Sequence, residues 1–208
     1  MPEFDWSQLY QHRKHIAERY GELWDLPMEK RYHSVLSTLG DKTTQVLDIG
    51  AGDRSLQSRL ELIWGGCAYK SCDIDLSYQH DFDHIDQVSG EFDLICMFEI
   101  IEHLELEDAS RLLQRCFSHL TQGGRIVITT PNIYYPPGYL RDVTHRSAWC
   151  YDELAGFLEM IGFKVNSIHR LYHDSLIKRL LRQYVFYPWF RIMHFDFARQ
   201  IIVVATKE

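Results

Sequence analysis

The sequence predicts a single α/β domain with a doubly wound, mostly parallel β-sheet and helices on both faces. From residue 45 onward, short apolar runs of strand character alternate with amphipathic segments of about 10–15 residues. Parallel strands joined by right-handed crossover helices produce this alternation. The length of 208 residues suits one domain with a substantial core.

Residues 1–44 precede the alternating pattern and are expected to be helical. Apolar side chains recur there at helix-face spacing, and Pro27 interrupts the run. We therefore expect two helices between Trp6 and Leu39. They would belong to the same domain and act as a lid over its cleft.

The alternating pattern occupies residues 45–208. We expect strands at 46–50, 68–74, 92–98, 125–130, 163–171 and 201–205. We expect helices at 55–63, 106–120 and 151–161, the second ended by Gly123-Gly124 and the third by Gly162. Prolines predict a loop at 133–139, and an aromatic-rich insertion at about 172–197 separates the last two strands.

Composition limits the classes of partner and compartment. The net charge of −7 gives no global attraction to nucleic acid, which makes a nucleic-acid partner unlikely. The five cysteines form no Cys-x-x-Cys pair, which is typical of buried, reduced thiols. No secretory signal and no run of about 20 apolar residues is visible, so we expect a cytoplasmic protein.

A glycine-rich turn follows the first predicted strand, in the run Asp48-Ile49-Gly50-Ala51-Gly52-Asp53. Gly50 and Gly52 let the backbone approach a ligand closely, at the sheet edge where α/β proteins bind ligands. Asp73 follows about 20 positions later, where a carboxylate accepts hydrogen bonds from both ribose hydroxyls. This spacing fits either a nicotinamide dinucleotide or S-adenosylmethionine.

Two details of the turn favour S-adenosylmethionine. Asp48 precedes the glycines, where its carboxylate can meet the cationic amino group of a methionine moiety. The third glycine of the dinucleotide fingerprint is missing, so a pyrophosphate would be poorly bound.

Four motifs resemble those of class I S-adenosylmethionine-dependent methyltransferases. Residues 46–53 resemble motif I, and residues 92–104 resemble the motif at the end of strand four. Residues 123–132 and 162–165 are similar to the motifs of strands five and six. The resemblance covers about residues 45–207, in the right order, and implies a Rossmann-like sheet of seven strands whose last strand is antiparallel.

The resemblance also implies which residues contact the cofactor. Those around the glycine turn would bind the methionine part, an acidic residue would bind the ribose, and others would flank the adenine or touch the cofactor from strand four. In that order they are Asp48, Gly50, Ala51 and Gly52, then Asp73, then Asp81 and Phe82, then Met97 and Phe98. Arg54 departs from the family pattern, which often has a third glycine there, and this leaves the conformation of the turn open.

A second group of chemically active residues follows the strand at 92–98. Glu99, Glu102 and His103 fall at i, i+3 and i+4, and they would share one face of a helical turn. Burial of these groups without partners is unfavourable, and a divalent cation such as Mg or Mn would relieve it. His145 would supply a fourth ligand.

This Glu-x-x-Glu-His pattern resembles two groups of metal-dependent methyltransferases. They are the small-RNA 2′-O-methyltransferases and the O-methyltransferases of the ubiquinone pathway. The resemblance implies a cation that orients a diol or catechol oxygen and lowers its pKa. Two alternatives stay open: His103 or His145 acts as a general base beside Glu102 without a metal, or the cluster is structural.

The sequence therefore predicts S-adenosylmethionine-dependent methyl transfer to a small molecule. An oxygen is the expected acceptor atom, ahead of a nitrogen or a carbon. A metal-dependent RNA 2′-O-methyltransferase, a catalytically silent binding protein of the same fold and a nicotinamide oxidoreductase are the alternatives. The amphipathic helix that begins near Leu176 could touch a membrane as a peripheral contact, although a helix that covers the sheet is the favoured interpretation. Nothing in the sequence predicts the oligomeric state.

Overall fold

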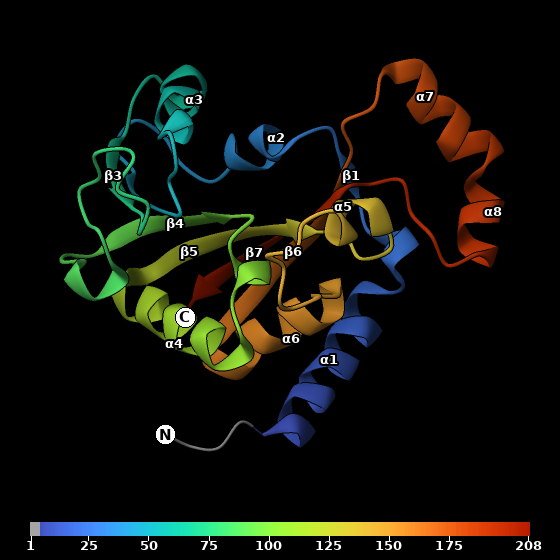
Figure 1. The fold of residues 1–208 in the computed structure, drawn as a ribbon, viewed down its shortest axis with the longest axis horizontal. Coiled ribbons are helices and arrows are strands. Elements are labelled where there is room, and N and C mark those ends of the chain that lie inside the picture. The colour runs from blue at the N-terminus through green and yellow to red at the C-terminus, as the bar shows by residue number, and fades with distance from the viewer. Residues whose placement is uncertain (1–4) are drawn as a thin grey trace.

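The structure is a computed structural model that describes residues 5–208, built around one seven-stranded sheet (Figure 1). Residues 1–4 of the predicted N-terminal segment lie outside the described part. The strand order is β1-β6-β7-β5-β4-β2-β3, and β7 is antiparallel to both of its neighbours. The other four pairs are parallel. The predicted Rossmann-like fold is confirmed.

Within residues 5–208, α-helices and shorter helical turns connect the strands of the sheet. The strands are β1 (Met28–Glu29), β2 (Gln45–Ile49), β3 (Ala68–Cys72), β4 (Phe92–Phe98), β5 (Leu120–Pro131), β6 (Phe163–Leu171) and β7 (Gln200–Lys207). The α-helices are α1 (Trp6–Tyr20), α2 (Tyr32–Leu36), α3 (Ser55–Trp64), α4 (Leu106–His119), α5 (Pro136–Leu140), α6 (Tyr151–Ile161), α7 (Leu176–Leu180) and α8 (Tyr187–Ile192). Shorter turns are the 3-10 helices η1 (Leu23–Asp25), η2 (Ile85–Gln87) and η3 (Ile101–His103), and the π-helical turn η4 (Leu181–Val185).

Side chains alternate across the strands and form one core on each face of the sheet. Leu47 and Ile95 point into the larger core, which includes buried residues of α1, α4 and α6. Val46 and Leu94 point into the smaller core, together with residues of α2 and α3. Figure 1 shows these two groups of helices on opposite sides of the sheet.

The order of the strands determines where a ligand can bind. From β2 the chain crosses to β3, which pairs with one edge of β2, and then to β4, which pairs with the other edge of β2. The helices and turns that leave these strands diverge there, and the crevice lies outside the carboxyl ends of β2 and β4.

The N-terminal segment contains two helices, α1 and α2, between Trp6 and Leu39. The long helix α1 packs against α6 on the larger core face, where Arg13 Nε donates to Asp152 Oδ2 at 2.8 Å. Part of the segment also joins the sheet, because β1 pairs with β6 at its edge. That these helices act as a lid stays a prediction.

The segment between α4 and β5 also differs from the prediction. The helix ends at His119, and the strand begins at Leu120 and continues through Gly123-Gly124. A Cβ at Gly124 would lie 3.1 Å from the carbonyl oxygen of Phe92 on the neighbouring strand. Glycine is therefore used there for close approach of two strands, beside a register shift in the β4–β5 pair, and it does not end the helix.

The insertion between β6 and β7 contains α7, η4 and α8, and a buried ionic network holds its end to the sheet. Arg170 Nη1 donates to Asp196 Oδ1 at 3.1 Å, and Asn132 Nδ2 donates to Asp196 Oδ2 at 2.9 Å. All three side chains are buried. In the described part of the chain, no helix is long and apolar enough to cross a membrane.

We predict that Gly156→Ala weakens the packing of α1 on α6. A Cβ there would lie 2.8 Å from the backbone nitrogen of Arg13, so the helices would have to separate. We expect a loss of about 1–3 kcal/mol of stability, despite the better helix propensity of alanine. Urea unfolding measures it, with Ser58→Ala on the exposed side of α3 as control. A Gly156→Ala protein as stable as the unsubstituted one would contradict this packing.

Candidate active site

Two cavities meet at Gly50, at the carboxyl ends of the central strands. The larger one, of about 1440 Å³, extends past Asp73 toward η2 and η3. The smaller one, of about 270 Å³, lies over the start of α3 and reaches Phe98 and Glu99 at the end of β4. Because Gly50 lines both, a ligand bound across it would occupy the two cavities together.

Gly50 must be glycine for two separate reasons. Its φ of 72° lies in the left-handed region, which is unfavourable for a residue with a Cβ. A Cβ would also lie 2.1 Å from Cδ1 of Ile100. Gly52 has a φ of 48°, but a Cβ there would meet nothing within 4 Å among the described residues. The first glycine therefore permits contact with the β4 end, and the second serves the turn.

Arg54 adopts the left-handed conformation that a third glycine would have, with a φ of 59°. Its guanidinium donates to the carbonyl oxygen of Gln79 at 3.0 Å and lies 5.5 Å from the ring centroid of Tyr69. It also lies 3.6 Å from Asp81. These contacts offset the strain of a residue with a Cβ in the left-handed region, so the turn keeps at Arg54 a conformation that glycine adopts freely.

Asp73 lines the larger cavity and braces the glycine turn. Its Oδ2 accepts from the Gly52 N–H at 2.7 Å, and its Oδ1 accepts from the Asp75 N–H at 2.9 Å. Each carboxylate oxygen has a second lone pair, so two hydroxyls of a ribose can still donate to it.

Asp48 lines the smaller cavity and is 3% exposed. Burial raises the pKa of this carboxyl to about 7, although the Tyr69 hydroxyl donates to Oδ2 at 2.6 Å and opposes the shift. A ligand ammonium group placed beside it would favour the ionised form. Ala51, Gly52 and Phe98 line the same cavity.

Three predicted cofactor contacts lie elsewhere in the described structure. Asp81 accepts from the Ser71 N–H and from Lys70 Nζ, both at 3.0 Å, so its carboxylate ties the chain after β3 to that strand. Phe82 bridges to Cys72 and packs on the larger core, and Met97 is fully buried in that core. None of the three lines either cavity.

Other residues that the sequence did not single out complete the two cavities. Ile74, His84 and Ile85 line the larger one, together with Asp73. Tyr32 and Gln200 line the smaller one. Ile74 and Ile85 lie on either side, in sequence, of Asp81 and Phe82, the two residues that the resemblance assigned to the adenine.

The second cluster begins with Glu99, which has an unusual backbone conformation. Its φ of 56° is left-handed, and its N–H donates to the carbonyl oxygen of Thr129 at 3.1 Å. Its Oε1 is buried and finds no hydrogen-bond partner within residues 5–208. Burial raises the pKa of this carboxyl, and hydrogen bonds from Gln200 and Thr129 partly offset that effect. Such strain at a buried carboxylate is typical of functional sites.

Glu102 is fully buried, with one oxygen left unpaired. Thr130 Oγ1 donates to its Oε2 at 3.3 Å, while Oε1 has no hydrogen-bond partner in the described chain. Burial and the neighbouring Glu99 carboxylate raise the pKa of Glu102 to about 8. Its backbone oxygen accepts from the N–H groups of Arg146 and Ser147, which brings the loop with His145 to the cluster.

His103 and His145 face each other, with ring centroids 4.8 Å apart. Nδ1 of His145 donates to the carbonyl oxygen of Tyr139 at 2.8 Å, which leaves Nε2 with a free lone pair. Thr144 Oγ1 donates its proton to Asp142 at 2.7 Å, and therefore accepts from Nδ1 of His103 at 2.9 Å. Both rings are thus held through Nδ1, as in imidazoles that bind metals, and Nε2 of His145 lies 3.9 Å from Asp142 Oδ2.

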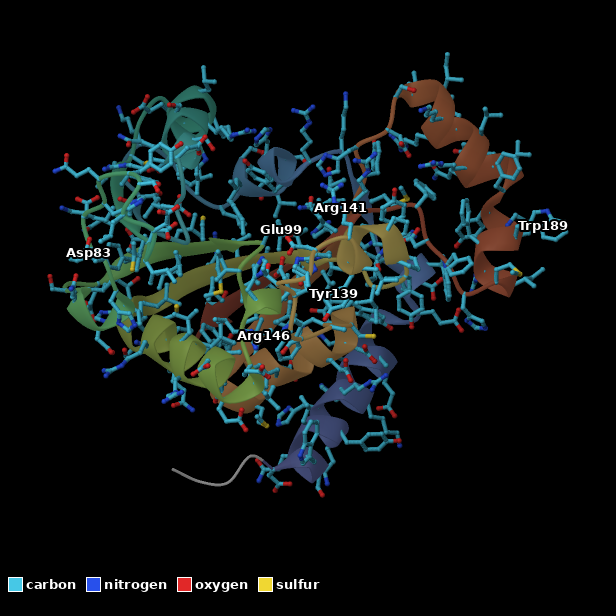
Figure 2. The ribbon with its side chains drawn as sticks, viewed as in Figure 1. Asp83, Glu99, Tyr139, Arg141, Arg146 and Trp189 are labelled. Carbon is cyan, nitrogen blue, oxygen red and sulfur yellow. The ribbon has the colours of Figure 1, made fainter. Side chains whose placement is uncertain are left out.

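The structure brings three of the four predicted metal ligands together. One ligand atom from each of Glu102, His103 and His145 lies within 4.8 Å of the other two. Glu99 lies beside them, but outside that distance, because the helical turn begins only at Ile101. The prediction of one helical face for Glu99, Glu102 and His103 was therefore wrong, and the backbone turn at Glu99 sets its position. Figure 2 shows Glu99 at the end of the central strands.

Comparisons with known proteins agree with this geometry. A family model described as "Methyltransferase domain" matches residues 17–186. The chain belongs to the S-adenosylmethionine-dependent methyltransferases. The predicted resemblance and the cofactor, S-adenosylmethionine, are thereby confirmed.

Solved structures share this methyltransferase fold. An S-adenosylmethionine-dependent methyltransferase from Archaeoglobus fulgidus superimposes with a TM-score of 0.64 and 19% identity, over 98% of this chain and 100% of that chain. Magnesium protoporphyrin IX methyltransferase from Synechocystis PCC 6803, crystallised with bound SAH, gives a TM-score of 0.57 and 13% identity, over 100% of this chain and 90% of that one.

Curated relatives match shorter parts of the methyltransferase. A small RNA 2′-O-methyltransferase from Rattus norvegicus is 39% identical over 62 residues, which is 28% of this chain and 16% of that protein. A probable S-adenosylmethionine-dependent methyltransferase from Mycolicibacterium smegmatis is 32% identical over 93 residues, which is 42% of this chain and 35% of that protein. The chain therefore spans about a third or less of the length of these relatives.

We predict that Asp73→Asn weakens the binding of S-adenosylmethionine, whereas Asp81→Asn does so far less. Loss of a charged acceptor for the ribose hydroxyls corresponds to roughly 1.5–3 kcal/mol, or about 10- to 150-fold in affinity. Asp81 serves as the control carboxylate, because it lines neither cavity and its hydrogen bonds are to Ser71 and Lys70. Isothermal titration of both folded variants measures the effect. Equal losses of affinity in the two variants would indicate that Asp81 also contacts the cofactor, as the resemblance implies.

We predict that Glu102 makes the metal-free protein less stable as the pH rises. Its pKa is raised from 4.5 to about 8, so the folded protein retains a proton that the unfolded chain has released. This stabilising contribution is complete below pH 4.5 and is lost as the pH rises through 8. Within that window the slope approaches about 1.4 kcal/mol per pH unit.

Urea unfolding in chelator between pH 5 and pH 9 tests this on the unsubstituted protein and on Glu102→Gln. The difference between the two profiles isolates Glu102 from other groups such as Asp48. Glu105→Gln, at an exposed carboxylate paired with Arg146, is the matched control. Parallel profiles for the unsubstituted protein and Glu102→Gln would contradict the assigned shift.

Proposed function

We propose that the chain is an O-methyltransferase of a small molecule with adjacent hydroxyls, and that it uses a divalent cation. The observation that carries this proposal is that ligand atoms of Glu102, His103 and His145 lie within 4.8 Å of one another. His103 also lines the larger cavity. Two further facts about the donor set support it. The Oε1 atoms of Glu99 and Glu102 are buried and unpaired in the described chain, and both imidazoles are oriented by hydrogen bonds at Nδ1.

The donor set suits a cation such as Mg²⁺ or Mn²⁺. Carboxylate oxygens suit Mg²⁺ and Mn²⁺, whereas imidazole nitrogens suit transition metals, so of these two ions the mixed set favours Mn²⁺. When bound, the cation would supply a Lewis acid that orients an acceptor hydroxyl and lowers its pKa, and S-adenosylmethionine would supply a methyl group on a cationic sulfur. The protein must then align the oxygen with that methyl group.

The residues of this chain would contribute binding, orientation and proton release. Glu102 would give up its proton when a cation binds, because its raised pKa keeps it protonated near neutral pH. Asp142, through Thr144, holds the ring of His103, and the Tyr139 carbonyl holds that of His145. The Tyr139 ring, 5.0 Å from the His145 ring, offers an aromatic face to a flat acceptor.

A second candidate is methylation of a ribose 2′-oxygen in RNA. The observation that favours it is the similarity of 62 residues to the small RNA 2′-O-methyltransferase of Rattus norvegicus. Arg111 and Arg115 also line the far part of the larger cavity, where a phosphate could bind. The net charge of −7 opposes it, because RNA binding draws most of its affinity from phosphate contacts.

We predict that methyl transfer requires both a divalent cation and the two histidines. The experiment incubates the protein with S-adenosylmethionine, Mn²⁺ and one of four acceptors: a catechol, a phenol, or an RNA oligonucleotide with or without its terminal 2′-hydroxyl. Mass spectrometry detects the product. We expect methylated catechol, loss of product in chelator and return with Mn²⁺. Product from the 2′-hydroxyl RNA alone would favour the second candidate.

Manganese titration gives a readout that does not depend on the acceptor. We expect His145→Ala to lower the affinity for Mn²⁺ by about 100-fold or more, and Thr144→Val to lower it by about 10-fold because His103 loses its orienting contact. His119→Ala, at an exposed histidine that hydrogen-bonds to the Gly90 carbonyl oxygen, is the matched control. Activity that survives chelation, with equal manganese binding in all variants, would contradict the metal site.

A further inference from the structure

The insertion between β6 and β7 carries most of the exposed apolar surface of the molecule. We refer to residues 175–195 as the arm. Of the nineteen large hydrophobic side chains that are exposed in the described structure, eleven belong to it. Ile177 is 72% exposed and Trp189 is 66% exposed. Such a concentration on a soluble domain marks an interaction surface.

The arm stands away from the sheet and is firmly held at its base. Figure 1 shows α7 and α8 projecting to one side of the domain, and Figure 2 shows Trp189 pointing away from the body. Tyr187 Oη donates to the carbonyl oxygen of Trp24 at 3.2 Å, and the N–H of Asp196 donates to the carbonyl oxygen of Tyr134 at 2.7 Å. The apolar side chains are therefore presented on an anchored support.

The charge of the arm is opposite to that of the whole chain. Residues 175–195 include Lys178, Arg179, Arg182 and Arg191 and no acidic residue, in a protein whose net charge is −7. Arg182 pairs with Asp174, Arg191 pairs with Glu22, and Arg179 donates to the Tyr172 hydroxyl. Lys178 is exposed and forms no ion pair with any described residue. Cations are thus interleaved with exposed Leu, Ile, Tyr and Trp side chains.

We propose that the arm binds the surface of an anionic lipid bilayer. Interfacial segments of proteins combine these features: basic groups that attract acidic headgroups, aliphatic side chains that enter the acyl boundary, and aromatic residues at the interface. The arm would lie on the bilayer and not cross it, because its helices are short. A protein partner fits less well, since Lys178 and Arg179, which pair with no described carboxylate, lie among the apolar side chains and match a uniformly anionic surface.

The proposal is tested by sedimentation of the full chain with vesicles, in the absence of donor and acceptor. Vesicles of phosphatidylcholine alone are compared with vesicles that also contain phosphatidylglycerol. We expect binding to the anionic vesicles, weakened by salt because the Debye length shortens. The double variant Ile177→Ser/Trp189→Ala should bind at least about 10-fold more weakly. Lys178→Ser should bind about fivefold more weakly, which corresponds to roughly 1 kcal/mol per basic residue at the surface.

Leu62→Ser is the matched control, because Leu62 is 88% exposed on α3 and far from the arm in sequence. It should bind vesicles as the unsubstituted protein does, and circular dichroism should show all variants folded. Equal binding to both vesicle types, or unchanged binding of the double variant, would overturn the proposal. So would gel filtration that shows self-association lost in the double variant, combined with no vesicle binding, since a second copy would then cover the arm.

Discussion

The contact between Gly50 and Ile100 joins the glycine turn after β2 to the segment that follows β4. The position of a Cβ on Gly50 would overlap the Ile100 side chain, so the glycine turn and the end of β4 touch without any side chain between them. Asp48 and Glu99 line the smaller cavity beside this contact, Asp73 lines the larger one, and Glu102 lies close to Ile100 in sequence. A methyl donor that binds at the turn is therefore placed beside Glu99 and Glu102, the acidic cluster.

The acidic cluster is energetically unfavourable unless something binds there. Two carboxyl groups are buried next to each other, and each keeps one oxygen unpaired within residues 5–208. A buried polar group without a partner costs roughly 1–3 kcal/mol, and more when it is charged. The rest of the sheet, with its two continuous cores, supplies the stability that tolerates this arrangement. Sites of this kind are retained for function and not for stability.

The sequence predicted those elements whose side chains carry a pattern. The strands at 92–98 and 163–171 and the helix at 151–161 have the predicted bounds, because their apolar periodicity and the stop at Gly162 are local signals. The strand Met28–Glu29 was missed because it has only two residues and is held by backbone hydrogen bonds to the β6 edge. Such pairing leaves no trace in side-chain pattern.

The sequence likewise predicted only part of the candidate site. Gly50, Gly52 and Asp73 follow from spacing along the chain, and their positions agree with a cofactor turn. Asp81 could not be placed, since its hydrogen bonds to Ser71 depend on how the loop after β3 folds back. The orienting contacts of the histidines were equally hidden, because one partner is a backbone carbonyl and the other a hydroxyl in a turn.

Arg54 has a consequence for the entropy of ligand binding. A glycine at that position would leave the unliganded turn free to sample many backbone conformations. Arginine narrows that range, and its contacts with Gln79 and Tyr69 hold the left-handed geometry in the absence of any ligand. The turn is therefore preorganised, and the donor binds without first having to order the loop that receives it.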